Sequence, residues 1–221
     1  MKGAALVIGG LLLSAGALVL ETAPGTSATM PKAPAHAIVR YAAPGPAATS
    51  EGRIFLTQAQ LRQALASGTI DRPVKSLLAV DSPLSFGEYK WNDRGIPAGP
   101  TWVRIDLASQ LISIFRAGHE IGTAVIVYGG DNKETPVGKL HILGKARKHR
   151  SSLYDAEMPY TLRLTNDGVS IHGSKVLWGA ATHGCIGVPL GFAQRLFEAT
   201  RVGDEVVIVP ADRPMRGQRP S

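Results

Sequence analysis

The sequence predicts a mostly β protein, with strands in a β-sandwich-like or open, barrel-like arrangement and one or two short helices. Two observations support this fold class. Short runs rich in β-branched residues alternate with turn residues over 101–209, and only brief stretches show helical spacing. With 221 residues, of which 44% are hydrophobic, the chain can bury a sizeable core.

The predicted strands follow one another closely in the second half of the chain. A hairpin joins Trp102–Asp106 to Leu111–Phe115, and a third strand covers Ile121–Tyr128. Four more strands are predicted, at Leu140–Leu143, Thr161–Leu164, Val169–Ile171 and Glu205–Val209.

Two short helices are predicted on either side of these strands. Thr57 can cap a helix that runs to about Ser67, where Gly68 stops it. Pro189–Ala199 carries apolar residues at helical spacing behind an initial proline, which predicts a second helix packed on the core. The apolar segment 73–80 is predicted as either a short helix or a strand.

The N-terminus has the pattern of an export signal. Lys2 precedes an uncharged apolar run, Gly3–Leu20, and small residues up to Ala28 offer a cleavage site. We expect export to the periplasm or cell envelope, with membrane contact only through this segment. The predicted organisation is a signal peptide or membrane anchor at 1–28, a Pro/Ala-rich linker at 29–52, an N-terminal extension at 53–100, the main β domain at 101–210 and a basic tail at 211–221.

The chain is basic, with a formal net charge of +7 and a pI of about 9.8. Such a charge favours anionic surroundings, such as nucleic acid, anionic lipid or a wall polymer. The densest basic run, Lys145–Arg150, lacks the interleaved aromatic residues of a nucleic-acid site, so no nucleic-acid partner is predicted. We interpret the run as a solvated loop, with contact to carboxylates of a substrate as the alternative.

The stretch Ile171–Pro189 (IHGSKVLWGAATHGCIGVP) holds the chemistry of this chain. It carries the single cysteine, Cys185, with His172 and His183 on a glycine-rich segment. A free thiol has a pKa near about 8.5 and is mostly protonated at neutral pH, so a neighbouring imidazole that accepts its proton makes it a nucleophile. A single cysteine in an oxidising compartment also cannot form an intramolecular disulfide, which favours use as a free thiol over a buried, inert one.

This stretch resembles the signature of the L,D-transpeptidases with a YkuD-type catalytic domain. A His-Gly pair on one strand, His172-Gly173, is followed by Thr182-His183-Gly184-Cys185 and an apolar residue. A T-P-x-G sequence beginning at Thr135 is a second point of resemblance. The resemblance covers roughly half of the chain and implies a β-sandwich with the cysteine loop in a cleft.

The resemblance also implies roles for individual residues. Cys185 would be the nucleophile, His172 the general base and the carbonyl of Gly173 its orienting partner. The backbone amides of His183, Gly184 and Cys185 would form the oxyanion hole. The side chain of His183 has a structural, turn-shaping role as an equal alternative. Thr182, Tyr154 and Met158 are predicted to touch substrate, with core packing as the alternative for the last two. No metal and no cofactor are predicted.

Two features depart from the family pattern. The residue two positions after the cysteine is usually Arg or Asn, and here it is Gly187. An arginine there would be a natural carboxylate partner, so substrate anchoring must come from elsewhere. His172 also lies 13 residues before Cys185 (185 − 172), a few residues closer than is common in the family. A shorter intervening loop is expected to alter the acceptor side of the cleft.

The predicted function is that of a peptidoglycan L,D-transpeptidase. It would act through a cysteine thioester on tetrapeptide stems and form cross-links between diamino acid residues. The predicted partners are peptidoglycan stem peptides and carbapenem-type inhibitors. Three alternatives stay open: L,D-carboxypeptidase or D-amino acid exchange by the same thioester, a cysteine peptidase acting on ordinary L-peptides, and a non-catalytic peptidoglycan-binding protein.

Overall fold

A computed structural model describes residues 48–50, 52–129, 134–151, 155–180 and 182–211 of the chain. The predicted signal or anchor segment, nearly all of the linker, Tyr154 and the basic tail lie outside these residues. Within the described residues, no helix is both long and apolar enough to cross a membrane.

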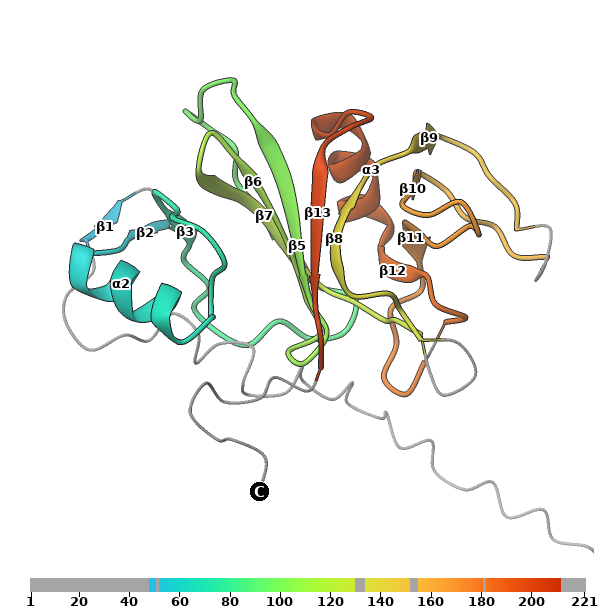
Figure 1. The fold of residues 1–221 in the computed structure, drawn as a ribbon, viewed down its shortest axis with the longest axis horizontal. Helices are drawn as coiled ribbons and strands as arrows, with labels where there is room; N and C mark the ends of the chain where they lie inside the picture. The colour runs from blue at the N-terminus through green and yellow to red at the C-terminus, as the bar shows by residue number, and fades with distance from the viewer. Residues whose placement is uncertain (1–47, 51, 130–133, 152–154, 181, 212–221) are drawn as a thin grey trace, which may run out of the picture.

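A six-stranded mixed sheet forms the centre of the molecule (Figure 1). Neighbouring strands of this sheet are antiparallel, with one exception: the last strand of the chain, Glu205–Val209, is parallel to Thr101–Asp106. In spatial order the strands are β4 (Tyr89–Trp91), β7 (His119–Val125), β6 (Leu111–Arg116), β5 (Thr101–Asp106), β13 (Glu205–Val209) and β8 (Gly138–His141).

A smaller, four-stranded sheet lies beside it, on the right in Figure 1. One edge pair is parallel, and the central pair and the other edge pair are antiparallel. The strands are β12 (Ile186–Pro189), β11 (Ser170–Ser174), β10 (Thr161–Arg163) and β9 (Gly144–Ala146), and helix α3 (Leu190–Ala199) follows the first of them directly. Neither sheet closes on itself.

One hydrophobic core joins the two sheets and helix α3. Ile105 and Ile112 of the large sheet, Leu162 and Ile171 of the small one, and Phe192 of the helix are all buried in the same cluster. Full burial of such a side chain contributes about 1.5–3 kcal/mol. The core therefore fixes the small sheet against the large one, and the predicted mostly β, sandwich-like fold with two helices is confirmed.

The segment before β5 folds against the opposite face of the large sheet. It contains β1 (Ala48–Ser50), β2 (Arg53–Phe55), α2 (Gln58–Ala66) and β3 (Leu77–Leu78), of which the three strands form a small sheet (Figure 1). Thr57 caps α2 as predicted, with Gln60 completing a reciprocal capping box. Ile70 and Leu77 pack in one cluster with Phe115 of β6, so apolar contacts attach this segment to the sheet.

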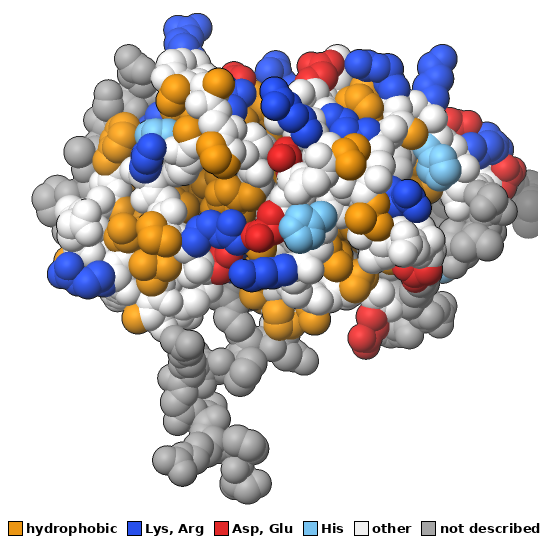
Figure 2. All heavy atoms as spheres, turned by 45° about the horizontal axis from the view of Figure 1, so that its top comes forward, with side chains coloured by type: hydrophobic (Ala, Val, Ile, Leu, Met, Phe, Trp, Pro, Cys, Tyr) orange, Lys and Arg blue, Asp and Glu red, His pale blue; other side chains and the backbone are white. Residues whose placement is uncertain are grey.

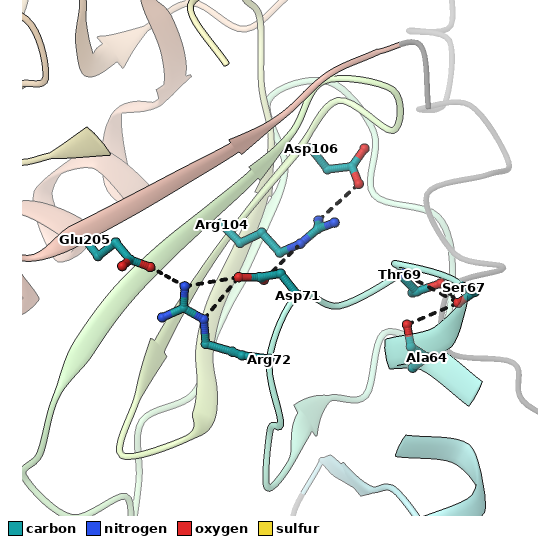
Figure 3. Close-up of polar contacts among 8 residues, drawn as sticks. All are labelled: Ala64, Ser67, Thr69, Asp71, Arg72, Arg104, Asp106 and Glu205. Carbon is teal, nitrogen blue, oxygen red and sulfur yellow. Dashed lines mark hydrogen bonds and ion pairs between the residues drawn. The ribbon is translucent and has the colours of Figure 1, made fainter. Parts of the chain in front are cut away.

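A charged cluster adds a second attachment (Figure 3). Arg104 on β5 is buried and lies between Asp106, 3.0 Å away, and Asp71, 3.7 Å away. Arg72, the next residue along the segment, forms ion pairs with Asp71 and with Glu205 on β13. Opposite charges thus alternate across the junction between the N-terminal segment and the sheet.

The structure corrects several element boundaries. The third predicted strand starts earlier, at His119, and ends at Val125. The strand predicted at Val169–Ile171 runs instead from Ser170 to Ser174, so His172 lies in its interior and not at its end. Strand β12 was not predicted, because its sequence IGVP is buried throughout and has no alternating pattern. The short strands β4 and β9 were also missed.

Candidate active site

The two halves of the sequence motif meet on neighbouring parallel strands. Ile171 pairs with Ile186, and both side chains point into the core. Because side chains alternate along a strand, His172 and the residue just before β12, Cys185, face the other side of the sheet. Both line one cleft of about 690 Å³. The register of β11 and β12 therefore brings the thiol and the imidazole to the same cavity.

A backbone hydrogen bond holds the imidazole of His172. Its Nδ1 lies 3.0 Å from the carbonyl oxygen of Gly173. Because a carbonyl only accepts, Nδ1 carries the proton, and in the neutral ring Nε2 keeps its lone pair. Burial lowers the pKa of His172, the Gly173 carbonyl opposes that shift, and the charge of nearby His149 adds to it. The ring is therefore held in the neutral form that can accept a proton at Nε2.

The thiol of Cys185 is half-buried and is not part of a disulfide. Its Sγ lies 3.8 Å from the carbonyl oxygen of Gly168, which is within reach of a weak S–H donor. The hydroxyl of Ser170 donates to the same carbonyl at 3.0 Å. The carbonyl of Gly168 thus contacts two side chains that line the cleft, Ser170 and Cys185.

Thr135, from the T-P-x-G sequence, supports the cysteine loop. Its buried hydroxyl donates to the carbonyl of Gly184 at 3.1 Å and accepts from the amide of Gly129 at 3.0 Å. Gly184 has a φ of 93°, which favours glycine, and it turns the chain into Cys185. In the sequence this segment is only a second point of resemblance, with no role assigned to Thr135. The supporting role was missed because the hydroxyl and its acceptor are 49 residues apart.

The remaining loop contacts come from Thr182. Its amide donates to the carbonyl of Tyr128 at 2.9 Å, and its hydroxyl donates to the carbonyl of Cys185. Thr182 and His183 both line the cleft, and so does Met158, which is also buried. The wall position of Met158 is compatible with both predicted roles, substrate contact and packing. The predicted contact of Tyr154 lies outside the described residues.

Close strand packing accounts for the glycine at position 187. A Cβ atom there would lie 2.7 Å from Cγ2 of Val127 and 3.0 Å from Cβ of Ser174. Val127 and Gly187 also exchange two backbone hydrogen bonds, of 3.0 and 2.8 Å. The arginine that is usual in the family would not fit here unless Val127 or Ser174 shifted. Gly173 is similarly crowded, with Leu190 and Pro159 at 3.0–3.1 Å from an added Cβ.

The basic run Lys145–Arg150 is not simply a solvated loop. Its first two residues belong to β9, and the ammonium of Lys145 donates to the carbonyls of Phe197 and Thr200 at the end of α3. His149 lines the cleft. On the face drawn in Figure 2, Lys and Arg side chains are spread among hydrophobic and acidic ones and do not form one continuous basic surface.

The fold and the cleft define a class of protein: a mostly β domain with a thiol and an oriented imidazole on adjacent strands, the groups required for acyl transfer. Residues 100–208 match the model of the YkuD family, described as the L,D-transpeptidase catalytic domain. This region of the chain belongs to that family and is an L,D-transpeptidase-type domain.

Solved L,D-transpeptidases are also similar to this chain. L,D-transpeptidase 1 of Mycobacterium tuberculosis is 23% identical, with a TM-score of 0.45 over 50% of this chain and 62% of its own. An L,D-transpeptidase from Stackebrandtia nassauensis is 23% identical, with a TM-score of 0.47 over 60% of this chain and 62% of its own. A third structure, of the LD transpeptidase LdtMt1 in complex with imipenem, is 24% identical, with a TM-score of 0.45 over 49% of this chain and 58% of its own.

This chain therefore spans about three fifths of the length of each of these solved chains. None of the curated proteins matches it.

Proposed function

We propose that the protein is an exported peptidoglycan L,D-transpeptidase that works through a thioester on Cys185. The observation that carries this proposal is the pairing of β11 with β12, which brings Cys185 and His172 to one cleft with the imidazole held through Nδ1. The YkuD match of residues 100–208 supports the same class of reaction. The substrate is a tetrapeptide stem whose third residue is a diamino acid and whose last is D-alanine.

In the first half-reaction His172 accepts the thiol proton at Nε2. The thiolate of Cys185 attacks the carbonyl of the third stem residue, at its L-centre. The amides of His183, Gly184 and Cys185 stabilise the oxyanion, and loss of one such donor typically costs about 100- to 1000-fold in rate. The carbon–nitrogen bond then breaks, and D-alanine leaves with the proton from His172. The thioester remains on the enzyme.

In the second half-reaction an amine of a second stem attacks the thioester. His172 removes the amine proton, the carbon–sulfur bond breaks and the thiolate is regenerated. The product is a direct cross-link between two diamino acid residues. If water attacks in place of the amine, the result is L,D-carboxypeptidase activity, and a free D-amino acid gives exchange.

Tetrapeptide stems distinguish these outcomes. Purified protein incubated with the tetrapeptide is expected to release D-alanine and to form a cross-linked dimer, both measured by mass spectrometry. Tripeptide without dimer would indicate a carboxypeptidase. Cleavage of ordinary L-peptides at a comparable rate would indicate the peptidase. Binding to peptidoglycan sacculi without release of D-alanine would indicate the non-catalytic binding protein.

The lowered pKa of His172 predicts the pH dependence of the reaction. The base must be neutral to accept the thiol proton, and burial favours the neutral ring. We therefore expect the acidic limb of kcat/KM to have its midpoint below 6.5, the ordinary value for this side chain. His172→Gln is expected to lower kcat/KM by about 100- to 10,000-fold and to remove that limb. A limb that persists in the variant would assign it to another group.

A further inference from the structure

Arg163 lies in one cross-strand row with Cys185. On the small sheet, Arg163 of β10 pairs with Ser170 of β11. On the other side of β11, Ile171 pairs with Ile186 of the parallel strand β12. The residues just before them, Ser170 and Cys185, are therefore also neighbours. Residues that face each other across strands project to the same side of a sheet. All three side chains of the row line the cleft, while those of the adjacent row are buried in the core.

The geometry of the sheet sets the reach of Arg163. Neighbouring strands lie about 4.8 Å apart, so two strand spacings put Cα of Arg163 roughly 10 Å from that of Cys185. Ser170 between them is small, buried and turned to the Gly168 carbonyl. The Arg163 side chain passes beside Gly144 of the neighbouring strand β9. Because the side chain is long and exposed, its guanidinium can turn to meet a group bound in the cleft a few ångströms from the thiol.

The charge of Arg163 is left available for a ligand. Its side chain is exposed, and among the described residues it has no carboxylate partner. Lys145 is engaged at the end of α3, and Arg150 pairs with two carboxylates, of Asp155 and Glu157. Of the other charged or titratable residues that line the cleft, Asp167 is acidic, and His149, His172 and His183 carry imidazoles.

We propose that Arg163 binds a carboxylate of the donor stem and so determines which stems are accepted. The proposal rests on the proposed function. It assigns to Arg163 on β10 the substrate anchoring that Gly187, which has no side chain, cannot supply. A planar guanidinium is suited to a bidentate hydrogen-bonded contact with a carboxylate. Two carboxylates can occupy the site: the terminal carboxylate of D-alanine, or the side-chain carboxylate of a third residue such as diaminopimelate.

Substrate pairs distinguish the two carboxylates. Arg163→Gln is expected to lower kcat/KM for D-alanine release from the diaminopimelate tetrapeptide by about 10- to 100-fold, with Arg163→Lys in between. The same variants are assayed on a tetrapeptide with a terminal amide and on one with lysine as third residue. Each of these two peptides lacks one of the two carboxylates. The peptide whose kcat/KM is unchanged by Arg163→Gln is the one that lacks the carboxylate bound by Arg163. Arg62→Gln, an exposed arginine on α2, serves as the matched control and is expected to match wild type.

A second measurement is independent of stem peptides. Iodoacetate and iodoacetamide alkylate the same thiol, but only iodoacetate carries a carboxylate. Arg163→Gln is therefore expected to lower the alkylation ratio, which is the rate with iodoacetate divided by the rate with iodoacetamide at Cys185. Unchanged alkylation by iodoacetamide would show that the thiol environment of the variant is intact.

The two proposals fail in different ways. An equal loss on all three peptides, or no loss on any, together with an unchanged alkylation ratio, overturns the carboxylate site. If wild-type protein releases no D-alanine, but Arg163→Gln lowers the alkylation ratio as expected, only the proposed function is overturned.

Discussion

Cys185→Ala is expected to abolish covalent capture of imipenem. If Cys185 is the nucleophile, its thiolate opens the β-lactam ring and the wild-type protein gains the mass of the inhibitor, whereas alanine offers no nucleophile. Loss of the nucleophile is expected to reduce turnover of stem peptides by a factor on the order of 10⁴ or more. Intact-mass spectrometry of the two proteins, with and without imipenem, measures the first effect.

Two controls make this experiment decisive. Arg62→Gln is expected to form the adduct like wild type. Alkylation of Cys185 by iodoacetamide establishes that the thiol is free in the preparation. A wild-type protein that is alkylated but gains no imipenem mass would contradict the transpeptidase proposal and favour a wall-binding protein or a peptidase of different specificity.

Arg53→Met is expected to destabilise the protein by about 3–5 kcal/mol. Arg53 on β2 is buried, and its guanidinium donates to the hydroxyl of Ser76 at 2.9 Å, the carbonyl of Asn92 at 3.0 Å and the carbonyl of Glu120. Burial lowers the pKa of Arg53, and the charge of Glu120 opposes that shift. Removal of the guanidinium leaves the buried Glu120 without this compensating charge.

Urea unfolding measures this effect. Arg62→Met, a change of the same kind at an exposed site on α2, is expected to alter the free energy of unfolding by less than about 0.5 kcal/mol. The double variant Arg53→Met/Glu120→Gln is expected to be more stable than the sum of the two single changes allows, because it removes both of the interacting charges together. Equal effects of Arg53→Met and Arg62→Met would contradict the structural role of Arg53.

The hydrogen bonds and charges around Arg53 and Glu120 tie the N-terminal segment to the large sheet. Glu120 lies on β7, and its carboxylate accepts from the amide of Leu78 on β3 at 2.8 Å. Strand β4, which also precedes residue 100, forms an edge of the large sheet by pairing with β7. The predicted boundary at 100/101 stays a prediction, and a single cooperative transition in the urea experiment would favour one folding unit on both sides of it.

Local patterns were sufficient where the physical cause is local. The helix cap at Thr57 and the strand at Glu205–Val209 depend on neighbouring residues, and both are confirmed. Buried strands such as β12 were missed because burial on both faces removes the alternation that identifies a strand. Arg53 and Thr135 were also missed, since nothing near them in sequence indicates their partners.

The sequence alone determined the residue types of the candidate site, the family resemblance of 101–210 and the mostly β composition, because motif spacing and hydrophobic periodicity can be read along one chain. Only the tertiary structure decided the register of β11 on β12, which unites Cys185 with His172, and the row that brings Arg163 to the same cleft. It also gave the reason for Gly187, where Val127 and Ser174 leave no room for a side chain. Such contacts join residues distant in sequence, so no local pattern records them.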